Sequence, residues 1–470
     1  MENNVVCIQG LGFVGLAMAT VVANAINEYN EPRYRVYGID LPAKQKVIDK
    51  INNGELPFET EDNSFTLELK RAVFEYRNLI ATTSEDYYSK AAMVIVDVHL
   101  TISKLDADDY SKYTLHSEPF KKAIHSLGKK INRDCLVLIE TTVPPGFVRN
   151  VVFPILKDEF SRRGINTDPI VAHSYERVMP GKDYINSIRK FFRTYSGLTE
   201  GAADRAKEFL TSIIDTRNYP LRRELVPEAS ELAKVLENSY RAMNIAFIYE
   251  WTLFAEKMGI NLFSVIEGIK NRTTHKNIMF PGLGVGGYCL TKDALLALWS
   301  NDSYYKSSFG FPFSTEALRI NDRMPLHVVD LINEFSSIKG KSIIIMGVSY
   351  REDIGDTRFS PSEVLYKELI SQGGNVMFHD PYIHCWSEIP TALFSDEIGD
   401  FDIVVFATRH KMYLSFSNDE LFEITKNASL VVDANNILSD EKISFLLCGT
   451  EANYINAVSY THLTLPTNSL

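Results

Sequence analysis

Cysteine and tryptophan are scarce in this 470-residue chain, which has five cysteines and three tryptophans. The cysteines stand at positions 7, 135, 289, 385 and 448, and they form no CxxC motif and no Cys/His pair of the spacing that binds zinc. This pattern argues against a disulfide framework and a structural metal. It favours a reducing compartment, so we expect a cytoplasmic protein without a bound metal.

Long apolar runs and an excess of positive charge are also missing. No run approaches the length of about 18 residues that a membrane-spanning helix needs, and the first residues, MENN, lack the basic start of a signal peptide. The 49 Lys and Arg residues are outnumbered by 60 Asp and Glu, which gives a formal net charge of -11. We therefore expect a soluble enzyme that binds neither nucleic acid nor membranes.

Short apolar runs alternate with amphipathic stretches in the first and last thirds of the chain, which predicts an α/β fold with doubly wound sheets. The expected strands cover residues 5–8, 34–40, 93–98, 135–142 and 170–172, and then 341–348, 375–379, 402–408 and 430–433. Long helices are expected over 227–258 and 314–335. The prediction is two Rossmann-like domains, residues 1–212 and 326–457, joined by a central helical domain of residues 213–325.

The helix expected over residues 227–258 has two contrasting faces. At about 100° per residue, one face collects Leu232, Val235, Leu236, Ser239, Met243, Phe247 and Phe254. The opposite face carries Lys234, Asn238 and Arg241. We expect the apolar face to pack against the protein and the polar face to be presented for binding, with simple solvation of the polar face as the alternative.

A glycine cluster, GLGFVG over residues 10–15, directly follows the first expected strand and opens a stretch that could be the first helix. In that context the cluster predicts a dinucleotide site formed by Gly10, Gly12, Phe13, Val14 and Gly15. Asp40 ends the next expected strand, and a carboxylate there favours NAD over NADP. The alternative is a flavin-binding or purely structural glycine turn.

The segment PGLGVGGYCLTKD, residues 281–293, sets Cys289 behind four glycines and before Lys292 and Asp293. A thiol beside a cation and a carboxylate is typical of covalent catalysis. An inert buried thiol is the alternative for Cys289, and a charge pair at a helix start is the alternative for Lys292 and Asp293.

Six segments together resemble the UDP-glucose/GDP-mannose dehydrogenase family of nucleotide-sugar dehydrogenases: residues 10–15, 140–146 (ETTVPPG), 175–181 (YERVMPG), 231–250, 281–293 and 347–361. The likeness runs to about residue 436. It implies a two-step oxidation of a sugar C6 alcohol to a carboxylate, with two NAD molecules and a cysteine thioester. It also implies that residues 1–212 bind NAD, that residues 213–325 build a homodimer and that residues 326–457 bind a UDP-sugar.

The resemblance implies roles for individual residues. Cys289 is the nucleophile, Asp293 handles protons, Lys234 and Asn238 steady the oxyanion and a water, Thr142 orients this water, and Glu176 assists thioester hydrolysis. Thr142 and Lys292 join the cofactor contacts. The implied substrate contacts are Glu176, Arg177, Lys234, Asn238, Arg241, Arg272, Gly286, Arg351 and Arg358. The alternatives are a structural ion pair at Glu176 and Arg177, a strand end at Thr142, and a solvated charged loop at Arg351 and Arg358.

Several positions depart from the family pattern. The motif at Glu176 resembles that of dehydrogenases acting on UDP-N-acetylhexosamines, with Pro180 in place of a second carboxylate. His99, Tyr288, Arg351 and Asn435 also differ from the residues usual in the family. We expect an NAD-dependent UDP-N-acetylhexosamine 6-dehydrogenase that feeds polysaccharide synthesis, such as one for UDP-N-acetylglucosamine or UDP-N-acetylmannosamine. The alternatives are a UDP-glucose 6-dehydrogenase and a non-catalytic nucleotide-sugar-binding protein.

The last residues, 458–470, fit no element around them. They resemble translated adapter sequence, and we predict a non-native tail. A natural disordered tail is the alternative.

Overall fold

The computed structural model describes residues 4–105, 110, 112–179, 181–386, 389–391, 400–450, 452–457 and 462–463. The chain divides into two compact units. The first contains Met1–Glu237 and Leu295–Gly310, and the second contains Asn238–Ala294 and Phe311–Leu470. The division into three domains that we expect from the sequence stays a prediction.

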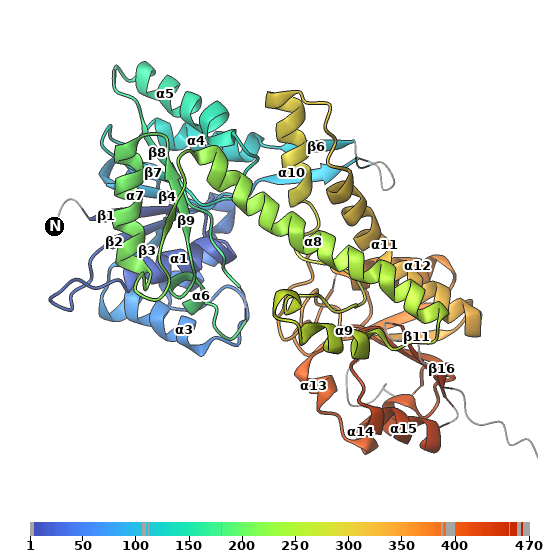
Figure 1. Ribbon diagram of the computed structural model, residues 1–470. Helices are drawn as coiled ribbons and strands as arrows, with labels where there is room; N and C mark the ends of the chain where they lie inside the picture. Colours follow the sequence, from blue (N-terminus) through green and yellow to red (C-terminus); the bar gives the residue numbers. More distant parts are fainter. Residues whose placement is uncertain are drawn as a thin grey trace, which may run out of the picture. The chain divides into compact units, whose positions relative to one another are not determined.

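The first unit is built on an eight-stranded sheet with the order β10-β9-β8-β7-β4-β1-β2-β3 (Figure 1). Its neighbouring strands are parallel except for the pair β8 and β9. The strands are β1 (Val5–Gln9), β2 (Arg35–Ile39), β3 (Leu79–Thr82), β4 (Met93–Val96), β7 (Leu136–Ile139), β8 (Ile170–His173), β9 (Thr194–Gly197) and β10 (Arg222–Arg223). Runs such as MVIV in β4 and LVLI in β7 are fully buried, as expected for parallel strands covered on both faces.

Helices pack around this sheet, and the first of them lies in the core. α1 (Phe13–Ala23) is apolar on all sides and is buried from Gly15 to Ala23, which is typical of a helix enclosed by protein. The other helices of the unit are α2 (Gln45–Asn52), α3 (Asn63–Lys70), α4 (Glu118–Gly128), α5 (Phe153–Arg162), α6 (Asn186–Arg189) and α7 (Glu200–Ile213). A hairpin of β5 (Thr101–Lys104) and β6 (Tyr113–His116) follows β4.

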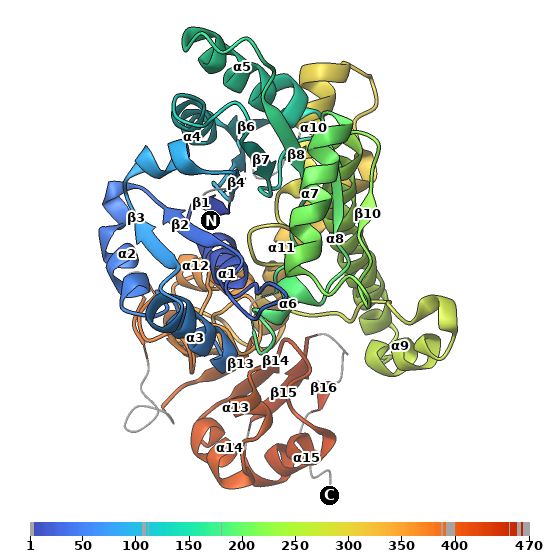
Figure 2. The same ribbon diagram turned by 90° about the vertical axis from the view of Figure 1, so that its left-hand side faces the viewer.

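The second unit has a six-stranded sheet with the order β12-β11-β13-β14-β15-β16. The strands are β11 (Ser342–Met346), β12 (Asn375–His379), β13 (Ile403–Phe406), β14 (Leu430–Asp433), β15 (Asn453–Asn456) and the antiparallel β16 (His462–Leu463). One face of the sheet packs against α11 (Pro312–Phe335) and α12 (Pro361–Ser371). The other face packs against α13 (Lys411–Leu414), α14 (Asn418–Thr425) and α15 (Asp440–Gly449) (Figure 2).

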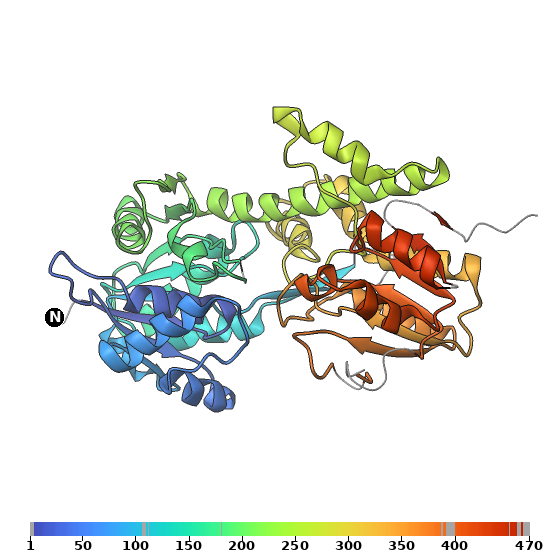
Figure 3. The same cartoon turned by 90° about the horizontal axis from the view of Figure 1, so that it is seen from below.

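A long helix, α8 (Pro227–Lys257), carries the chain out of the first unit and into the second as one unbroken helix (Figure 3). α9 (Leu262–Lys270) follows it, and Leu262 and Ile266 pack with Ile248 and Ala255 of α8. The remaining helix, α10 (Asp293–Ser300), begins directly after the cysteine segment.

The predicted fold class is confirmed: the protein is α/β with parallel sheets and a helical central region. All nine predicted strands are present, with ends that differ from the prediction by at most three residues. The helix predicted after the first glycine cluster, over residues 16–26, is present as α1 and begins earlier, at Phe13. The strands β3, β9, β10, β15 and β16 and the hairpin of β5 and β6 were not predicted.

The prediction for the faces of α8 holds for Val235, which is buried, and for Arg241, which is exposed, but it is wrong for most of the other residues. Leu236, Phe247 and Phe254 of the apolar face are 61%, 54% and 57% exposed, whereas Lys234 and Asn238 of the polar face are each 7% exposed. The reason lies in small residues that the periodicity does not weigh. Ala242 and Ala246 are buried on the packed face, and they allow α11 to approach so closely that the Asn321 side chain donates to the Ala242 carbonyl oxygen at 2.9 Å.

Candidate active site

The turn between β1 and α1 has the geometry of a dinucleotide-binding loop. Gly10 has φ +96°, and a Cβ there would lie 2.8 Å from the Asp97 carbonyl oxygen. A Cβ on Gly15 would collide with the Gly10 carbonyl oxygen. At Gly12, no described atom lies within 4 Å of the place a Cβ would take, so the backbone is open to a ligand.

The donor set of this turn fits NAD. Gly12 is the N-cap of α1 and supplies no side-chain cap, so the N-terminus of this helix, which begins with Phe13 and Val14, is suited to a pyrophosphate. Asp40 follows β2, is partly exposed and accepts from the Leu11 N–H at 2.9 Å and the Leu41 N–H at 2.7 Å. These bonds fix its carboxylate beside the glycine turn, where it can accept from ribose hydroxyls.

Thr142 lies in the loop after β7, and this loop is held by a buried glutamate of α8. Glu231 accepts from the Gly146 N–H at 2.5 Å and from the Val148 N–H at 2.8 Å. Burial raises the pKa of Glu231 to about 8. Thr142 is partly exposed, and its hydroxyl makes no hydrogen bond within the described part of the chain, so it remains available to a ligand or water.

Lys234 and Glu176 meet in the first unit. The Lys234 ammonium donates to the Glu176 carbonyl oxygen at 2.9 Å, lies 4.0 Å from Glu176 Oε1 and lies 5.5 Å from the centre of the Tyr175 ring. Arg177 does not pair with Glu176. Its Nη2 lies 2.8 Å from Glu237 Oε2, and its Nε also donates to the Glu237 carboxylate.

A group that sequence reasoning missed lies beside these residues. Asp97 and Glu140 directly follow the paired strands β4 and β7, and Glu140 lies 3.2 Å from the Arg193 guanidinium. Burial together with the neighbouring Glu140 and Glu176 raises the pKa of Asp97 well above its usual range, and burial raises that of Glu140 to about 7. The signal was present in the sequence, because each carboxylate ends an apolar run and adjacent parallel strands end at one edge of a sheet.

In the second unit, the cysteine segment forms a turn that leads into α10. The N–H groups of Lys292 and Asp293 donate to the Cys289 carbonyl oxygen at 3.2 and 3.0 Å. The Asp293 carboxylate accepts from the Lys292 ammonium and from the Asn238 amide, both at 2.7 Å. Sequence reasoning predicted these four residues, and the structure brings them together.

The ammonium of Lys292 interacts electrostatically with Cys289. Burial disfavours the charge of Lys292, but Asp293, Tyr288 and Cys289 together raise its pKa above the usual value. The ammonium also lies 4.3 Å from the centre of the Tyr288 ring, so the unusual Tyr288 serves as a cation–π partner. A persistent cation near Cys289 favours the thiolate form of a cysteine.

The glycines of this segment allow close packing against the loops of the second sheet. A Cβ on Gly286 would lie 2.5 Å from Tyr350 Cβ, and a Cβ on Gly287 would lie 2.8 Å from the Tyr350 ring. Gly287, with φ +80°, also donates its N–H to the Arg358 carbonyl oxygen at 3.0 Å. Gly282 lies against Asn435, whose Oδ1 accepts from the Leu283 N–H at 3.2 Å.

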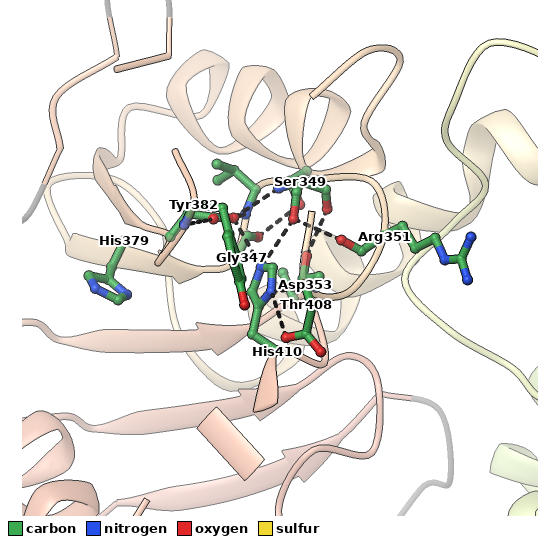
Figure 4. Close-up of polar contacts among 12 residues, drawn as sticks. Gly347, Ser349, Arg351, Asp353, His379, Tyr382, Thr408 and His410 are labelled. Atoms are coloured by element: carbon green, nitrogen blue, oxygen red, sulfur yellow. Dashed lines mark hydrogen bonds and ion pairs between the residues drawn. The ribbon is translucent and has the colours of Figure 1, made fainter. Parts of the chain in front are cut away.

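The loop that follows β11 carries the two arginines predicted for phosphates. Arg351 is exposed, and its guanidinium extends away from the polar cluster that holds its backbone (Figure 4). Arg358 is also exposed, but its guanidinium forms a bidentate ion pair with the Asp356 carboxylate. Its Nε donates to Oδ1 at 3.0 Å, and its Nη2 donates to Oδ2 at 2.6 Å. Arg351 is therefore the more accessible of the two.

Other predicted positions lie apart from these groups. Arg241 and Arg272 are exposed, and their side chains make no polar contact within the described part of the chain. His99 is exposed on the segment before β5. Pro180 and most of the predicted tail, residues 458–461 and 464–470, lie outside the described residues, while His462–Leu463 forms β16. None of the helices that the structure describes is long and apolar enough to cross a bilayer.

Family models match most of the chain. The UDP-glucose/GDP-mannose dehydrogenase family is matched by its NAD binding domain over residues 4–203, by its central domain over residues 228–323 and by its UDP binding domain over residues 344–440. The three models lie in the order that the sequence motifs indicate.

Individual proteins are similar over nearly their whole length. The UDP-N-acetyl-D-mannosamine dehydrogenase of Methanocaldococcus jannaschii is 28% identical over 93% of both chains. A solved structure titled as the UDP-D-ManNAc dehydrogenase of Pyrococcus horikoshii is 28% identical, with a TM-score of 0.77 over 93% of this chain and 96% of that one. A UDP-glucose dehydrogenase from Pyrobaculum islandicum shares the fold at 20% identity, with a TM-score of 0.80 over 97% of this chain and 98% of that one. This chain therefore belongs to the UDP-glucose/GDP-mannose dehydrogenase family and is an NAD-dependent UDP-sugar dehydrogenase.

Proposed function

We propose that this enzyme oxidises the C6 alcohol of a UDP-N-acetylhexosamine to the carboxylate in two steps, through a covalent adduct on Cys289. The observation that carries the proposal is the turn in which Cys289, Lys292, Asp293 and Asn238 are held together. The balance requires one substrate, one water and two NAD molecules for each acid, and it releases two NADH and three protons. NAD, when bound, supplies the hydride acceptor for both oxidations.

The covalent step assigns Cys289 as the nucleophile. Its thiolate attacks the aldehyde carbon and forms the carbon–sulfur bond of a thiohemiacetal, whose oxidation gives a thioester. Lys292 favours the thiolate by its charge. Asp293 is the counter-ion that keeps Lys292 in place and also orients the Asn238 amide, so we assign it a positioning role in addition to the proton handling that the family resemblance implies.

The remaining residues act on the oxygen atoms of the reaction. Lys234 and Asn238 stand four positions apart on α8, a spacing that puts two side chains on one side of a helix. We assign both to the oxyanion that forms at C6. Thr142 has a hydroxyl available for the hydrolytic water, and Glu176 is the carboxylate assigned to hydrolysis of the thioester.

The cofactor and the substrate are assigned to different sets of residues. Gly10, Gly12, Gly15 and the first turn of α1 would hold the NAD pyrophosphate, and Asp40 would hold its ribose. Arg351 is assigned to the UDP diphosphate, and Arg358 joins it when its pair with Asp356 is exchanged for phosphate oxygens. We assign Arg241, Arg272 and Gly286 to the substrate on the family resemblance alone.

An N-acetylated hexose is favoured over glucose by two findings. The segment YERVMPG follows the pattern of the UDP-N-acetylhexosamine dehydrogenases, and similar proteins from Methanocaldococcus and Pyrococcus bear the name UDP-N-acetyl-D-mannosamine dehydrogenase. The uronic acid product would serve polysaccharide synthesis. The scattered free cysteines and the use of NAD support a reaction in the cytoplasm.

A substrate panel tests this proposal. The purified full-length protein is incubated with NAD and one of UDP-N-acetylmannosamine, UDP-N-acetylglucosamine, UDP-N-acetylgalactosamine or UDP-glucose, and NADH and acid are both counted. We expect acid from an N-acetylated sugar and two NADH for each acid. A ratio near one would overturn the two-step mechanism, and the highest kcat/KM on UDP-glucose would overturn the substrate class.

A homodimer is the second part of the proposal. Tyr240, Met243, Phe247, Trp251 and Phe254 are exposed at helical spacing on α8, a continuous apolar stripe that a monomer would leave in water. A second copy of the same helix covers such a stripe in an isologous interface. Light scattering of the wild type and of Phe247→Glu tests this: we expect dimer and monomer, respectively. The control is Leu67→Glu, because Leu67 is an exposed leucine on α3; a monomeric wild type would overturn the assignment.

A further inference from the structure

A polar cluster lies where β11, β12 and β13 end in the second unit (Figure 4). His410 Nε2 lies 3.0 Å from Ser349 Oγ and 3.1 Å from Asp380 Oδ2. Serine, histidine and aspartate are the residue types of a hydrolytic triad. The proton positions decide whether this cluster can act in that way.

The hydrogen bonds show that His410 is not a base toward Ser349. The Asp353 N–H donates to His410 Nδ1 at 3.0 Å, so Nδ1 carries a lone pair and the ring proton is on Nε2. Nε2 is therefore a donor to Asp380 and Ser349. The Ser349 hydroxyl in turn donates to the Arg351 carbonyl oxygen at 3.0 Å. The cluster is a set of anchors for the loop that carries Arg351.

The anchored loop has a backbone conformation that needs support. Asp353 has φ +55°, in the left-handed region that costs a non-glycine residue about 1 kcal/mol. Residues 410 and 411 hold it there, because Lys411 donates its N–H to Asp353 Oδ1 at 3.0 Å and its ammonium lies 2.6 Å from Oδ2. With the bond to His410, three contacts fix the turn two residues after Arg351.

His410 itself is out of reach of a ligand. Its side chain is fully buried, and the rings of Tyr382 and Tyr413 lie with their centres 5.4 and 5.5 Å from its own. Any effect of His410 on a nucleotide must therefore pass through the loop that it holds.

We propose that His410 is a positioning residue for the diphosphate of the UDP-sugar: by accepting from the Asp353 N–H it fixes the backbone that presents Arg351. The inference rests on the proposed assignment of Arg351 to phosphate binding. The inference adds His410, a buried residue that does not contact the phosphates itself.

Two substitutions of His410 separate its two hydrogen bonds. In His410→Asn, the amide oxygen takes the place of Nδ1 and still accepts from the Asp353 N–H. In His410→Gln, the amide nitrogen takes the place of Nε2 and still serves Asp380 and Ser349, but the Asp353 N–H loses its acceptor. The pair therefore changes the support of Asp353 while both variants keep a neutral, buried amide.

The measurements are equilibrium binding of UDP, which needs no turnover, and the kinetic constants of the full-length enzyme. We expect His410→Gln to weaken UDP binding and raise the KM for the nucleotide sugar by about tenfold, the effect of one hydrogen bond left unmade. Its kcat and its KM for NAD should change by less than about twofold, and His410→Asn should stay within about threefold of the wild type in UDP binding.

The outcomes distinguish this inference from a purely structural role and from the proposed function. Equal UDP binding by the wild type and His410→Gln would overturn the inference, as would equal losses in both variants or parallel losses in kcat and in the KM for NAD. If the wild type binds UDP with the expected variant pattern but forms no acid, the inference stands and the proposed reaction fails. If Arg351→Ala binds UDP like the wild type, the arginine assignment and this inference both fail.

Discussion

In each unit, the turn that follows the first strand of the sheet has the same backbone geometry. Gly10 after β1 and Gly347 after β11 both have φ +96°. The N–H of each glycine donates to the last residue of the neighbouring strand, Gly10 to Ile39 at 2.8 Å and Gly347 to His379 at 2.7 Å. An aspartate follows that neighbouring strand in both units, at Asp40 and Asp380.

The two turns differ in what fills them. Asp40 is partly exposed, and the turn beside it opens at Gly12. Asp380 is buried and accepts from the N–H groups of Val348, Ser349 and Tyr382 and from His410. The same backbone turn therefore leaves the Asp40 carboxylate accessible to a ribose, whereas the Asp380 carboxylate is taken up by hydrogen bonds within the protein. This difference supports the proposed binding of NAD at the first turn, and it gives Asp380 a structural part in the second.

The largest expected effect contrasts the cysteines of the two units. Cys7 and Cys135 are buried in the first unit, where burial raises the pKa of Cys135 to about 12 and so keeps its thiol un-ionised. Cys289, by contrast, lies in a turn with the Lys292 ammonium. Cys289→Ser should lower acid formation by more than about a thousandfold. Acid is measured by chromatography, and Cys448→Ser, a change at an exposed thiol, is the matched control. An unchanged acid yield from Cys289→Ser would exclude the thiol from the reaction.

The second effect tests whether Asp380 is structural. Burial disfavours its charge, but the hydrogen bond from His410 and those from Ser349 and Tyr382 lower the pKa of Asp380 below its ordinary value. Asp380→Asn should lower the free energy of unfolding by about 3 kcal/mol, because buried donors then face an amide. Urea unfolding measures this, and Asp40→Asn should lose less than about 1 kcal/mol. Equal losses in the two variants would remove the contrast between the turns.

The third effect tests whether Asp40 serves the cofactor. Asp40→Asn should raise the KM for NAD about tenfold and reduce the discrimination against NADP, because the charge that repels a 2′-phosphate is gone. Asp380→Asn should leave the KM for NAD unchanged. Initial rates with both cofactors provide the measurement, and a KM for NAD that rises equally in both variants would contradict the comparison.

The smallest effect is a pH dependence that the units share. Burial lowers the pKa of His173 in the first unit to about 3 and that of His379 in the second unit to about 4. Because both values lie below the unfolded value of about 6.5, the unfolded chain binds more protons below that pH, and each histidine contributes stability that is lost as the pH falls. Between pH 7 and pH 5.5, each should cost about 1.4 kcal/mol.

Unfolding in urea at the two pH values measures this loss. His173→Gln and His379→Gln should each lose less stability on acidification than the wild type, whatever their stability at pH 7. A variant whose acid loss matches that of the wild type would show that the replaced histidine is already protonated in the folded protein.

The sequence predicted the fold well because its signals are local. Strands such as β12 and β14 are apolar runs between turns, and the glycine turn at residues 10–15 requires backbone conformations that few other residues adopt. The turn of Cys289, Lys292 and Asp293 was also visible, because its members lie within five residues. Their roles in catalysis and in substrate binding stay predictions.

The parts that sequence reasoning missed depend on partners far away in the chain. The burial of Lys234 and the exposure of Phe247 depend on which side of α8 meets small residues, and periodicity alone cannot decide this. The sequence likewise does not show that Arg177 pairs with Glu237 and Arg358 with Asp356, because several carboxylates could pair with each arginine. The hairpin of β5 and β6 lacks the apolar runs on which the strand predictions rested, whereas β3 is a short apolar run, LIAT, that the predictions overlooked.

The packing of Gly286 and Gly287 against Tyr350 ties the chemistry of this enzyme to its second sheet. The backbone of the Cys289 segment packs on Tyr350 and donates to the Arg358 carbonyl oxygen. Its conformation therefore depends on residues outside the segment. Truncation before β11 would remove the residues that the cysteine segment packs against. Transplanting that segment alone into another scaffold would transfer the thiol without the backbone support that its proposed reactivity needs. The proposed nucleophile therefore depends on the loop that follows β11 as well as on its own segment.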